Sequence, residues 1–311
     1  MPLRFTLRQL EYFVAVGEAG SIALASEAVN VSSPSISAAL SQLEREFGLQ
    51  FFVRKHAHGL SLTQAGRQFM TQAKIALHEA QALKQLASDI SGIVQGPLSV
   101  GCLLTFAQRV VPALRRTFEQ DYPQVQVSQV ELDQTGLIDQ LRTAEIDVAL
   151  TYDLEIPTDL HFLPLAELPP YAFLGEDHPL AGHAQVTAEE LAPHPMVMLD
   201  LPLSVDYFLS FFHDEGLRPN IVERTRDMAV MRSLVANGFG YSIANFRPLS
   251  NVAPDGRAIR YVPLAGALRP LRLGLVTAEG AQNVLTIKAF LQQCQRQIHQ
   301  SGVPGMNMHT P

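Results

Sequence analysis

Apolar and polar positions at the start of the chain recur with the period of an α-helix. One face of a first helix carries the apolar residues Leu7, Leu10, Phe13, Val14 and Gly17. Gly20-Ser21 breaks this pattern, and Ser21 is a candidate cap for a second helix over residues 22–29. After a turn at residues 30–32, Ser33-Pro34 is interpreted as the N-cap and first residue of a third helix that ends at Gly48.

The third helix has two chemically different faces. Its apolar face is predicted to meet a core and consists of Ile36, Leu40, Leu43 and Phe47. Its other face carries small or hydrogen-bonding residues: Ser35, Ser37, Ala38, Ser41, Gln42 and Arg45. A helix with such a face can approach the major groove closely, as the reader of a helix-turn-helix does. An ordinary three-helix bundle with a solvated polar face fits the same pattern.

The segment after the third helix favours DNA binding. Two short β-prone runs, 49–54 and 60–63, enclose a polar tip and predict a hairpin, or wing. Arg54 and Lys55 place two adjacent cations at its bend, where they can meet the DNA backbone or the minor groove. His56 and His58 could form a metal pair, but no third ligand is near them in sequence, so no metal site is predicted.

A long helix is predicted from residue 63 to about residue 93. Its apolar positions alternate by four and three residues: Phe69, Ala73, Ala76, Ala80, Leu83, Ala87 and Ile90. A heptad pattern sustained in this way is typical of helix pairing. We therefore expect a DNA-binding domain over residues 1–65, a dimerisation helix over 66–94, and a homodimer that suits a pseudo-palindromic DNA site.

Residues 95–300 alternate between strand-like and helical stretches, which predicts βαβ units and a mostly parallel sheet. Strands are expected near 98–103, 125–130, 146–150, 171–174, 196–199, 221–223, 240–243 and 271–277. Helices are expected near 107–120, 136–144, 204–215, 227–236 and 284–298. The return of the last strand and helix suggests two lobes, one of about 95–164 with 270–300 and one of about 165–269. Residues 301–311 are expected to be a flexible tail.

Charge and composition add limits rather than a function. The net charge is −7, but residues 1–94 hold eight Lys or Arg against seven Asp or Glu, so the acidity belongs to the rest of the chain. This slight basic excess does not by itself predict DNA binding. No export signal and no membrane span are apparent, so we expect a cytoplasmic protein. Cys102 and Cys294 are expected to be buried, reduced thiols.

The run from Leu7 to Gly66 resembles the DNA-binding half of LysR-type transcriptional regulators. The resemblance includes the S-x-S-x-x-L-x-x-LE-x-x-x-G-x-x-F-F-x-R core from Ser35 and the LT-x-AG that opens the long helix. It implies an α/β protein overall, with an N-terminal winged helix-turn-helix, a long dimerisation linker helix and a two-lobed effector-binding domain similar to type 2 periplasmic binding proteins. DNA contacts are then expected from Ser33, Pro34, Ser35, Ser37, Ala38, Ser41, Arg54 and Lys55. Family members often carry Gln at the position of Ser33 and a basic residue at Ala38 or Leu24, so base readout here is expected to differ.

A cleft between the two lobes is the expected effector site, because open α/β sheets bind ligands where strand ends and helix N-termini meet. Thr105, Thr151, Ser204 and Asp227 are the candidate effector-binding residues, although each can equally be an N-cap or loop residue. The resemblance implies small carboxylates or aromatic acids as effectors, and helix N-termini suit such anions. Asp227 would oppose an anion, which leaves the ligand charge open. No cofactor is predicted.

Three kinds of function are compatible with an α/β C-terminal part. An enzyme lacks support, because no complete Gly-rich dinucleotide fingerprint, G-x-S-x-G elbow or H-E-x-x-H motif is present. A transport-type solute-binding protein would carry an export signal in place of the helix-turn-helix. The prediction is therefore an effector-controlled regulator that binds double-stranded DNA as a dimer or tetramer and can contact RNA polymerase.

Overall fold

The structure is a computed structural model that describes residues 3–55 and 59–307, with only the backbone described at residues 54–55, 81–82 and 84–91. It separates into two compact units. The first consists of residues up to Ile93 together with the short segment Arg142–Glu145, and the second of the remainder from Val94. Each unit has its own hydrophobic core, so the two are described separately.

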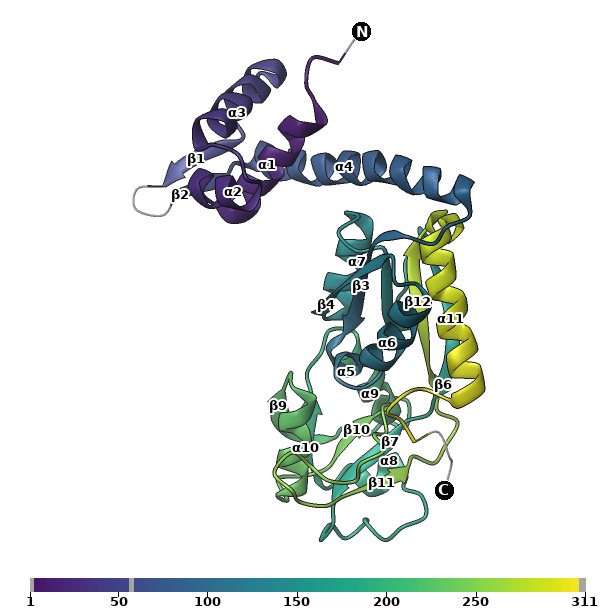
Figure 1. Cartoon of the computed structure of the whole chain (residues 1–311). Coiled ribbons are helices and arrows are strands. Elements are labelled where there is room, and N and C mark those ends of the chain that lie inside the picture. The colour runs from purple at the N-terminus through teal and green to yellow at the C-terminus, as the bar shows by residue number, and fades with distance from the viewer. Residues whose placement is uncertain (1–2, 56–58, 308–311) are drawn as a thin grey trace. The chain divides into compact units, whose positions relative to one another are not determined.

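The first unit has the predicted order of three helices, a hairpin and a long helix (Figure 1). Its elements are α1 (Leu7–Ala19), α2 (Ile22–Ala28), α3 (Ser33–Phe47), β1 (Phe52–Lys55), β2 (Gly59–Leu62) and α4 (Gln64–Ser91). β1 and β2 pair antiparallel, as expected for a wing. Ser33 is not the N-cap of α3: Ser32 holds the extended cap conformation, and Ser33 already has helical geometry with Pro34 at its side. Ser21 precedes α2 as expected, but its side chain makes no capping hydrogen bond.

An aromatic cluster forms the centre of the first unit. Phe13 of α1 contacts the rings of Phe51 and Phe69 at centroid distances of 5.2 and 5.1 Å. Phe51 and Phe69 stack on each other at 4.3 Å. Ile36 and Leu43 of α3 are fully buried in the same core. These contacts fix the orientation of α3, so its polar face points to solvent.

The wing is held against the end of α1 by a close backbone approach. The amide N of Leu60 donates to the carbonyl O of Gly20 at 2.7 Å. Gly59 has φ +79°, and a Cβ there would lie 2.5 Å from that same carbonyl O. Glycine is required at this place both for the left-handed backbone and for the space.

The apolar seam of α4 is partly covered by its own chain. Its first positions, Phe69 and Ala73, belong to the core of their own chain, so the expectation that the whole seam serves helix pairing is wrong there. Further along, Leu83 is 68% exposed. The side chains of Ala87 and Ile90 lie outside the described residues. The predicted pairing with a second copy therefore concerns only the part of α4 beyond Ala73.

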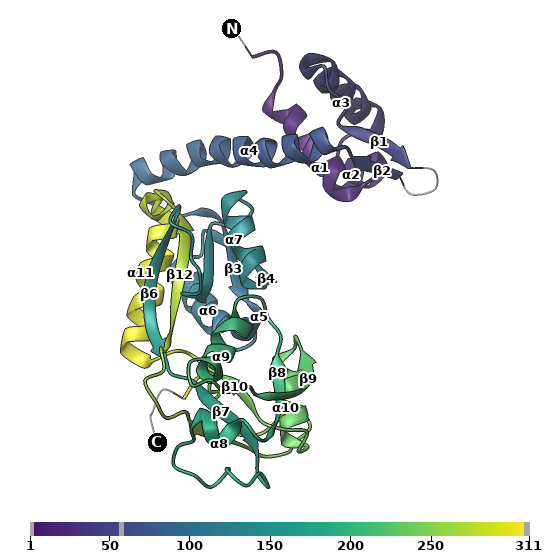
Figure 2. The ribbon, with the colours of Figure 1, turned by 180° about the vertical axis from the view of Figure 1, so that it is seen from behind.

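The first lobe of the second unit is built on a five-stranded sheet in the order β4-β3-β5-β12-β6. The strands are β3 (Gly96–Leu103), β4 (Val125–Leu132), β5 (Val148–Tyr152), β6 (Leu160–Leu168) and β12 (Leu271–Ala278). The lobe also contains the helices α5 (Leu104–Ala107), α6 (Val111–Asp121), α7 (Gln134–Arg142) and α11 (Leu285–Ser301) and the 3-10 turn η1 (Ala281–Asn283). Figure 2 shows α11 alongside β6 and β12.

The expected mostly parallel sheet is confirmed for the direction of four strands in this lobe and is wrong for β12. β3 is parallel to β4 and β5, but β12 is antiparallel to both β5 and β6. β12 brings the chain back from the second lobe and thus enters the sheet from the opposite direction. The helix expected over 107–120 begins later, as α6 at Val111, and the separate short helix α5 precedes it.

The second lobe consists of two small sheets. β7 (Tyr171–Gly175) pairs antiparallel with β10 (Ser242–Ala244) and β11 (Ile259–Pro263), and β8 (Pro195–Leu199) pairs parallel with β9 (Asn220–Thr225). Its helices are α8 (Ala188–Leu191), α9 (Ser204–His213) and α10 (Met228–Ala236). Strands β6 and β11 were not predicted from the sequence.

The C-terminal segment is not a flexible tail over its described residues 301–307. Val303 and Met306 are buried, and Met306 forms a β-bridge with Pro248. The amide N of Asn307 donates to the carbonyl O of Arg247 at 3.0 Å. The segment thus runs from α11 of the first lobe onto the chain that follows β10.

An ion-pair cluster fixes the place where the chain re-enters the first lobe. The Asp153 carboxylate accepts hydrogen bonds from Arg269 Nη2 at 2.6 Å and from Arg272 Nε at 2.8 Å, and its side chain is 4% exposed. Burial opposes ionisation, but the hydrogen bonds and charges of Arg272 and Arg269 outweigh it and lower the pKa of Asp153.

We expect Asp153→Asn to lower the free energy of unfolding of the second unit at pH 7 by about 1–2 kcal/mol, because both arginines lose a charged partner but remain half in solvent. A carboxyl with a depressed folded pKa stabilises above its unfolded value near 4 and loses this contribution as the pH falls further. The difference between wild type and variant should therefore shrink below about pH 4. Urea unfolding at pH 7 and pH 3.5 measures it, with the exposed Asp177→Asn as control; an equal difference at both pH values would contradict the assignment.

Candidate functional site

The solvent-facing side of α3, here called the α3 surface, brings together the predicted DNA-contacting residues of this helix. Pro34, Ser35, Ser37, Ala38 and Ser41 are exposed, and each is small. Ser33 is half-buried and its hydroxyl donates to Ser26 Oγ at 3.1 Å, so it fastens α2 to α3. The α3 surface thus offers a backbone that can come close to a flat or grooved partner.

Hydrogen-bonding groups on the α3 surface differ in their availability. Ser35 Oγ is 2.9 Å from Ser32 Oγ at the start of the helix. Arg45 folds back on the helix, with Nε donating to the carbonyl O of Ser41 at 3.2 Å. Among the described residues no hydrogen bond engages the hydroxyl of Ser37 or Ser41. These two hydroxyls are therefore the ones best placed to meet base edges or phosphate oxygens.

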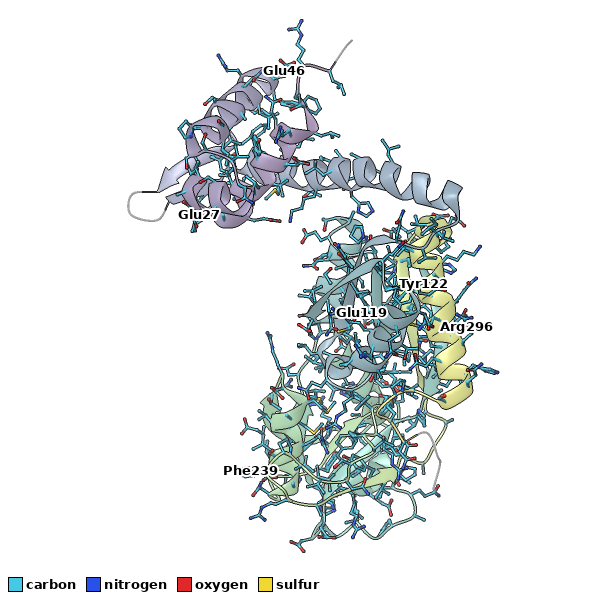
Figure 3. The ribbon with its side chains drawn as sticks, in the orientation of Figure 1. Glu27, Glu46, Glu119, Tyr122, Phe239 and Arg296 are labelled. Carbon is cyan, nitrogen blue, oxygen red and sulfur yellow. The ribbon has the colours of Figure 1, made fainter. Side chains whose placement is uncertain are left out.

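Two acidic side chains lie on the helices α2 and α3. Figure 3 labels Glu27 on α2 and Glu46 near the end of α3. Both carboxylates repel phosphate. The centre of α3 is therefore better suited to approach a polyanion than the parts of α2 and α3 that carry these two side chains. In the wing, the backbone of Arg54 pairs with that of Leu60, and the backbone of Lys55 pairs with that of Gly59. Their side chains, and all of His56 and His58, lie outside the described residues.

A pocket of about 130 Å³ lies between the two lobes of the second unit, and it is called the inter-lobe pocket here. From the first lobe it is lined by Leu104, Thr105, Gln108 and Arg109. From the second lobe it is lined by Leu201, Arg226, Asp227, Met228, Ala229, Arg232, Phe246, Pro248 and Pro254. A ligand held here touches both lobes at once.

Two of the four predicted effector residues reach this pocket. Thr105 lies in α5 and Asp227 is the N-cap of α10, so both lobes contribute one. Thr151 is 1% exposed and donates to Gln134 Oε1 at 2.9 Å, which makes it part of the first-lobe core. Ser204 does not line the pocket and is not a cap; it is the first residue of α9, and Leu203 is the N-cap with φ +65°.

Three arginines that the sequence analysis had not named also line the inter-lobe pocket: Arg109, Arg226 and Arg232. Arg232 is 3% exposed, and its Nη2 donates to the carbonyl O atoms of Ser250 and Val252 at 3.1 and 2.7 Å. The sequence signal that could have indicated Arg232 is that it is the only charged residue in the run MAVMRSLVA.

Asp227, which was expected to oppose an anion, is occupied by its own helix. Its Oδ1 accepts hydrogen bonds from the amide N of Ala229 at 2.6 Å and of Val230 at 3.2 Å. The carboxylate therefore caps α10, and the positive charges on the pocket wall outnumber the negative one. The pocket favours a negatively charged ligand.

The described residues contain no group of three His, Cys, Asp or Glu side chains that could hold a metal ion. None of their helices is long and apolar enough to cross a membrane.

Comparison with known proteins gives matches to both units. Residues 7–67 match the family described as bacterial regulatory helix-turn-helix protein, lysR family, and residues 91–298 match the LysR substrate binding domain. The crystal structure of HinK, a LysR family transcriptional regulator from Pseudomonas aeruginosa, is 34% identical, with a TM-score of 0.63 over 94% of this chain and 99% of that one.

Curated relatives agree with these matches. The DNA-binding transcriptional dual regulator OxyR of Escherichia coli is 27% identical over 278 residues, which are 88% of this chain and 90% of OxyR. The regulator CysB of Haemophilus influenzae is 29% identical over 244 residues, 76% of this chain and 74% of CysB. With both family domains matched in order over most of its length, the chain belongs to the LysR family of DNA-binding transcriptional regulators with an effector-binding domain.

Proposed function

We propose that this regulator reads its DNA site with the α3 surface, with Ser37 and Ser41 closest to the bases and Pro34, Ser35 and Ala38 allowing close approach. The observation that carries this is a row of small exposed residues on a helix whose opposite face is fixed in a core. Ser33 holds α2 and α3 together, and Arg54 and Lys55 of the wing contact the backbone or minor groove.

Two copies of the reader are held together by the second half of α4, where Leu83 is exposed. A homodimer places two α3 surfaces on two half-sites, and pairing of dimers through the effector-binding domains gives a tetramer. The regulator works in the cytoplasm, has no enzymatic activity of its own, and acts on RNA polymerase through its position on the promoter.

The effector binds in the inter-lobe pocket, with Thr105 on one wall and the Asp227-capped start of α10 on the other. A carboxylate, including that of an aromatic acid, suits the excess of arginine there. The effector changes DNA binding or promoter activity only through its different affinity for two arrangements of the lobes.

The test of DNA reading is a salt-titrated mobility shift of the full chain on DNA flanking its own gene. Sequence-specific binding whose affinity falls steeply with salt is the expected result, because each phosphate contact releases a counterion. Arg54→Ala should lower the affinity and also reduce the salt slope. Equal affinity for the flanking DNA and for unrelated DNA of the same length would overturn the proposal.

One relative is a hydrogen peroxide-inducible genes activator of Escherichia coli, but peroxide sensing through the cysteines is not expected of this chain. Cys102 and Cys294 are both buried and free, which confirms the sequence prediction. Burial raises the pKa of Cys102 to about 12 and also raises the pKa of Cys294, so neither forms the reactive thiolate at neutral pH.

We expect neither thiol of the folded chain to react with iodoacetamide or hydrogen peroxide within minutes at pH 7.5. Mass spectrometry of the intact protein measures this, and both thiols should react once the chain is unfolded in urea. DNA binding should also be the same before and after peroxide. Rapid modification of Cys102 in the folded protein would contradict the burial argument.

A further inference from the structure

Three arginines line the inter-lobe pocket, one from the first lobe and two from the second. Arg109 comes from the segment between α5 and α6 of the first lobe. In the second lobe, Arg226 directly precedes the N-cap of α10, and Arg232 lies in the middle of that helix. None of the three forms an ion pair with a described carboxylate. With the Asp227 carboxylate as the one acidic group of the lining, the pocket carries two uncompensated positive charges.

Arg232 is the clearest case of a charge without a charged partner among the described residues. It is buried, its Nη2 donates to two neutral carbonyl groups, and its Nε has no hydrogen-bond partner among the described residues. A buried charge without an opposite charge is costly, and proteins keep one where a ligand or a pairing group compensates it. Its place in the pocket wall makes a bound anion the compensating group.

Arg109 is held in place by the C-terminal segment. Gly305 has φ +71°, and a Cβ there would lie 2.9 Å from the Cβ of Arg109. The same segment hydrogen-bonds to the chain next to Pro248, through the amide N of Leu249 and the carbonyl O of Gly305 at 3.2 Å. Arg109 and Pro248 are both lining residues, so this segment supports the first-lobe and second-lobe walls together.

We propose that the effector of this pocket is a small dianion that bridges Arg109 of the first lobe and Arg226 with Arg232 of the second. This deepens the proposed function and rests on it. A pocket of about 130 Å³ has space for a four- to six-carbon dicarboxylate or a compact phosphate ester. Without it, like charges on the two walls repel each other and favour an open arrangement; with it, both walls are attracted to the same ligand and the closed arrangement gains.

The experiment measures the melting temperature and calorimetric affinity of the full chain with a set of simple anions at constant ionic strength. Succinate and glutarate represent dicarboxylates, inorganic phosphate and sulfate represent doubly charged oxyanions, and butyrate and chloride are the monoanion controls. We expect at least one dianion to bind tenfold or more tightly than any monoanion. The carboxylate and oxyanion arms then tell which dianion the pocket prefers.

Substitutions locate the binding. Arg226→Gln and Arg109→Gln should each weaken dianion binding about tenfold or more, and they should leave monoanion responses unchanged. Arg224→Gln is the matched control, because Arg224 is exposed two residues away and faces Asp200 at 3.5 Å. Arg226 is exposed, so its variant should fold even if Arg232→Gln does not.

Equal responses to dianions and monoanions, no response to any dianion, or loss of binding in Arg224→Gln as large as in Arg226→Gln would each overturn the dianion assignment. A mobility shift on the same preparations separates the two proposals. Specific DNA binding without a dianion response overturns only the ligand class. Dianion binding to Arg109 and Arg226 without specific DNA binding overturns only the proposed reader.

Discussion

Ser37→Asp is expected to weaken specific DNA binding by at least about 100-fold at 0.1 M salt. Ser37 lies exposed at the centre of the α3 surface. The substitution replaces a small hydroxyl by a negative charge facing the phosphates, and a dimer carries it twice. A cost of roughly 1–3 kcal/mol for each spoiled base contact gives a loss of this size for two half-sites.

Two comparison variants separate charge from size and from general repulsion. Ser37→Ala removes the hydroxyl and should cost only about tenfold or less. Gln72→Glu adds the same charge to an exposed position of α4 in the same unit and should change affinity only slightly. Quantitative mobility shifts with all four proteins give the result. Comparable losses in Ser37→Asp and Gln72→Glu would mean that α3 does not approach the DNA.

Phe13→Ala is expected to destabilise the first unit by about 3–5 kcal/mol, the usual cost of removing a buried phenylalanine ring. Phe13 is 0% exposed and touches Phe51, Phe52 and Phe69, so it joins α1 to the wing and to α4. A small domain has only about 5–15 kcal/mol of total stability, so the variant should lose DNA binding as the temperature rises well before wild type does.

Urea unfolding of the full chain followed by circular dichroism measures the loss, and mobility shifts at 10 °C and 37 °C follow its consequence. Phe239→Ala is the matched control: Phe239 is 55% exposed in the second lobe, where Figure 3 labels it, and its truncation should cost less than about 1 kcal/mol. An unchanged unfolding curve for Phe13→Ala would show that the aromatic cluster is not what fixes α3.

The two units differed in how well their sequence predicted them. In the first, contacts between neighbouring segments dominate, so the four-three spacing of Ile36, Leu40 and Leu43 and the turn at Gly48 were enough to place α3 and its exposed face. The seam of α4 was misjudged at Phe69 and Ala73, because periodicity shows which face is apolar but not which partner covers it.

In the second unit the order of elements was largely foreseen, but their pairing was not. Strand direction depends on where the chain returns, and the antiparallel entry of β12 beside β5 follows from the crossover out of the second lobe. For the same reason the buried segment 301–307 looked like a tail, since its partners near Pro248 are more than fifty residues away in sequence.

The sequence by itself determined the family, the reading helix and the existence of a two-lobed effector domain, because each rests on a local pattern of apolar and small residues. Only the tertiary structure decided the composition of the pocket. Thr151 does not line the pocket because it is hydrogen-bonded within the first-lobe core. Ser204 does not line it either and follows Leu203, which is the N-cap of α9. The packing of the two lobes brings together in the pocket lining three arginines that lie up to 123 positions apart along the chain: Arg109, Arg226 and Arg232.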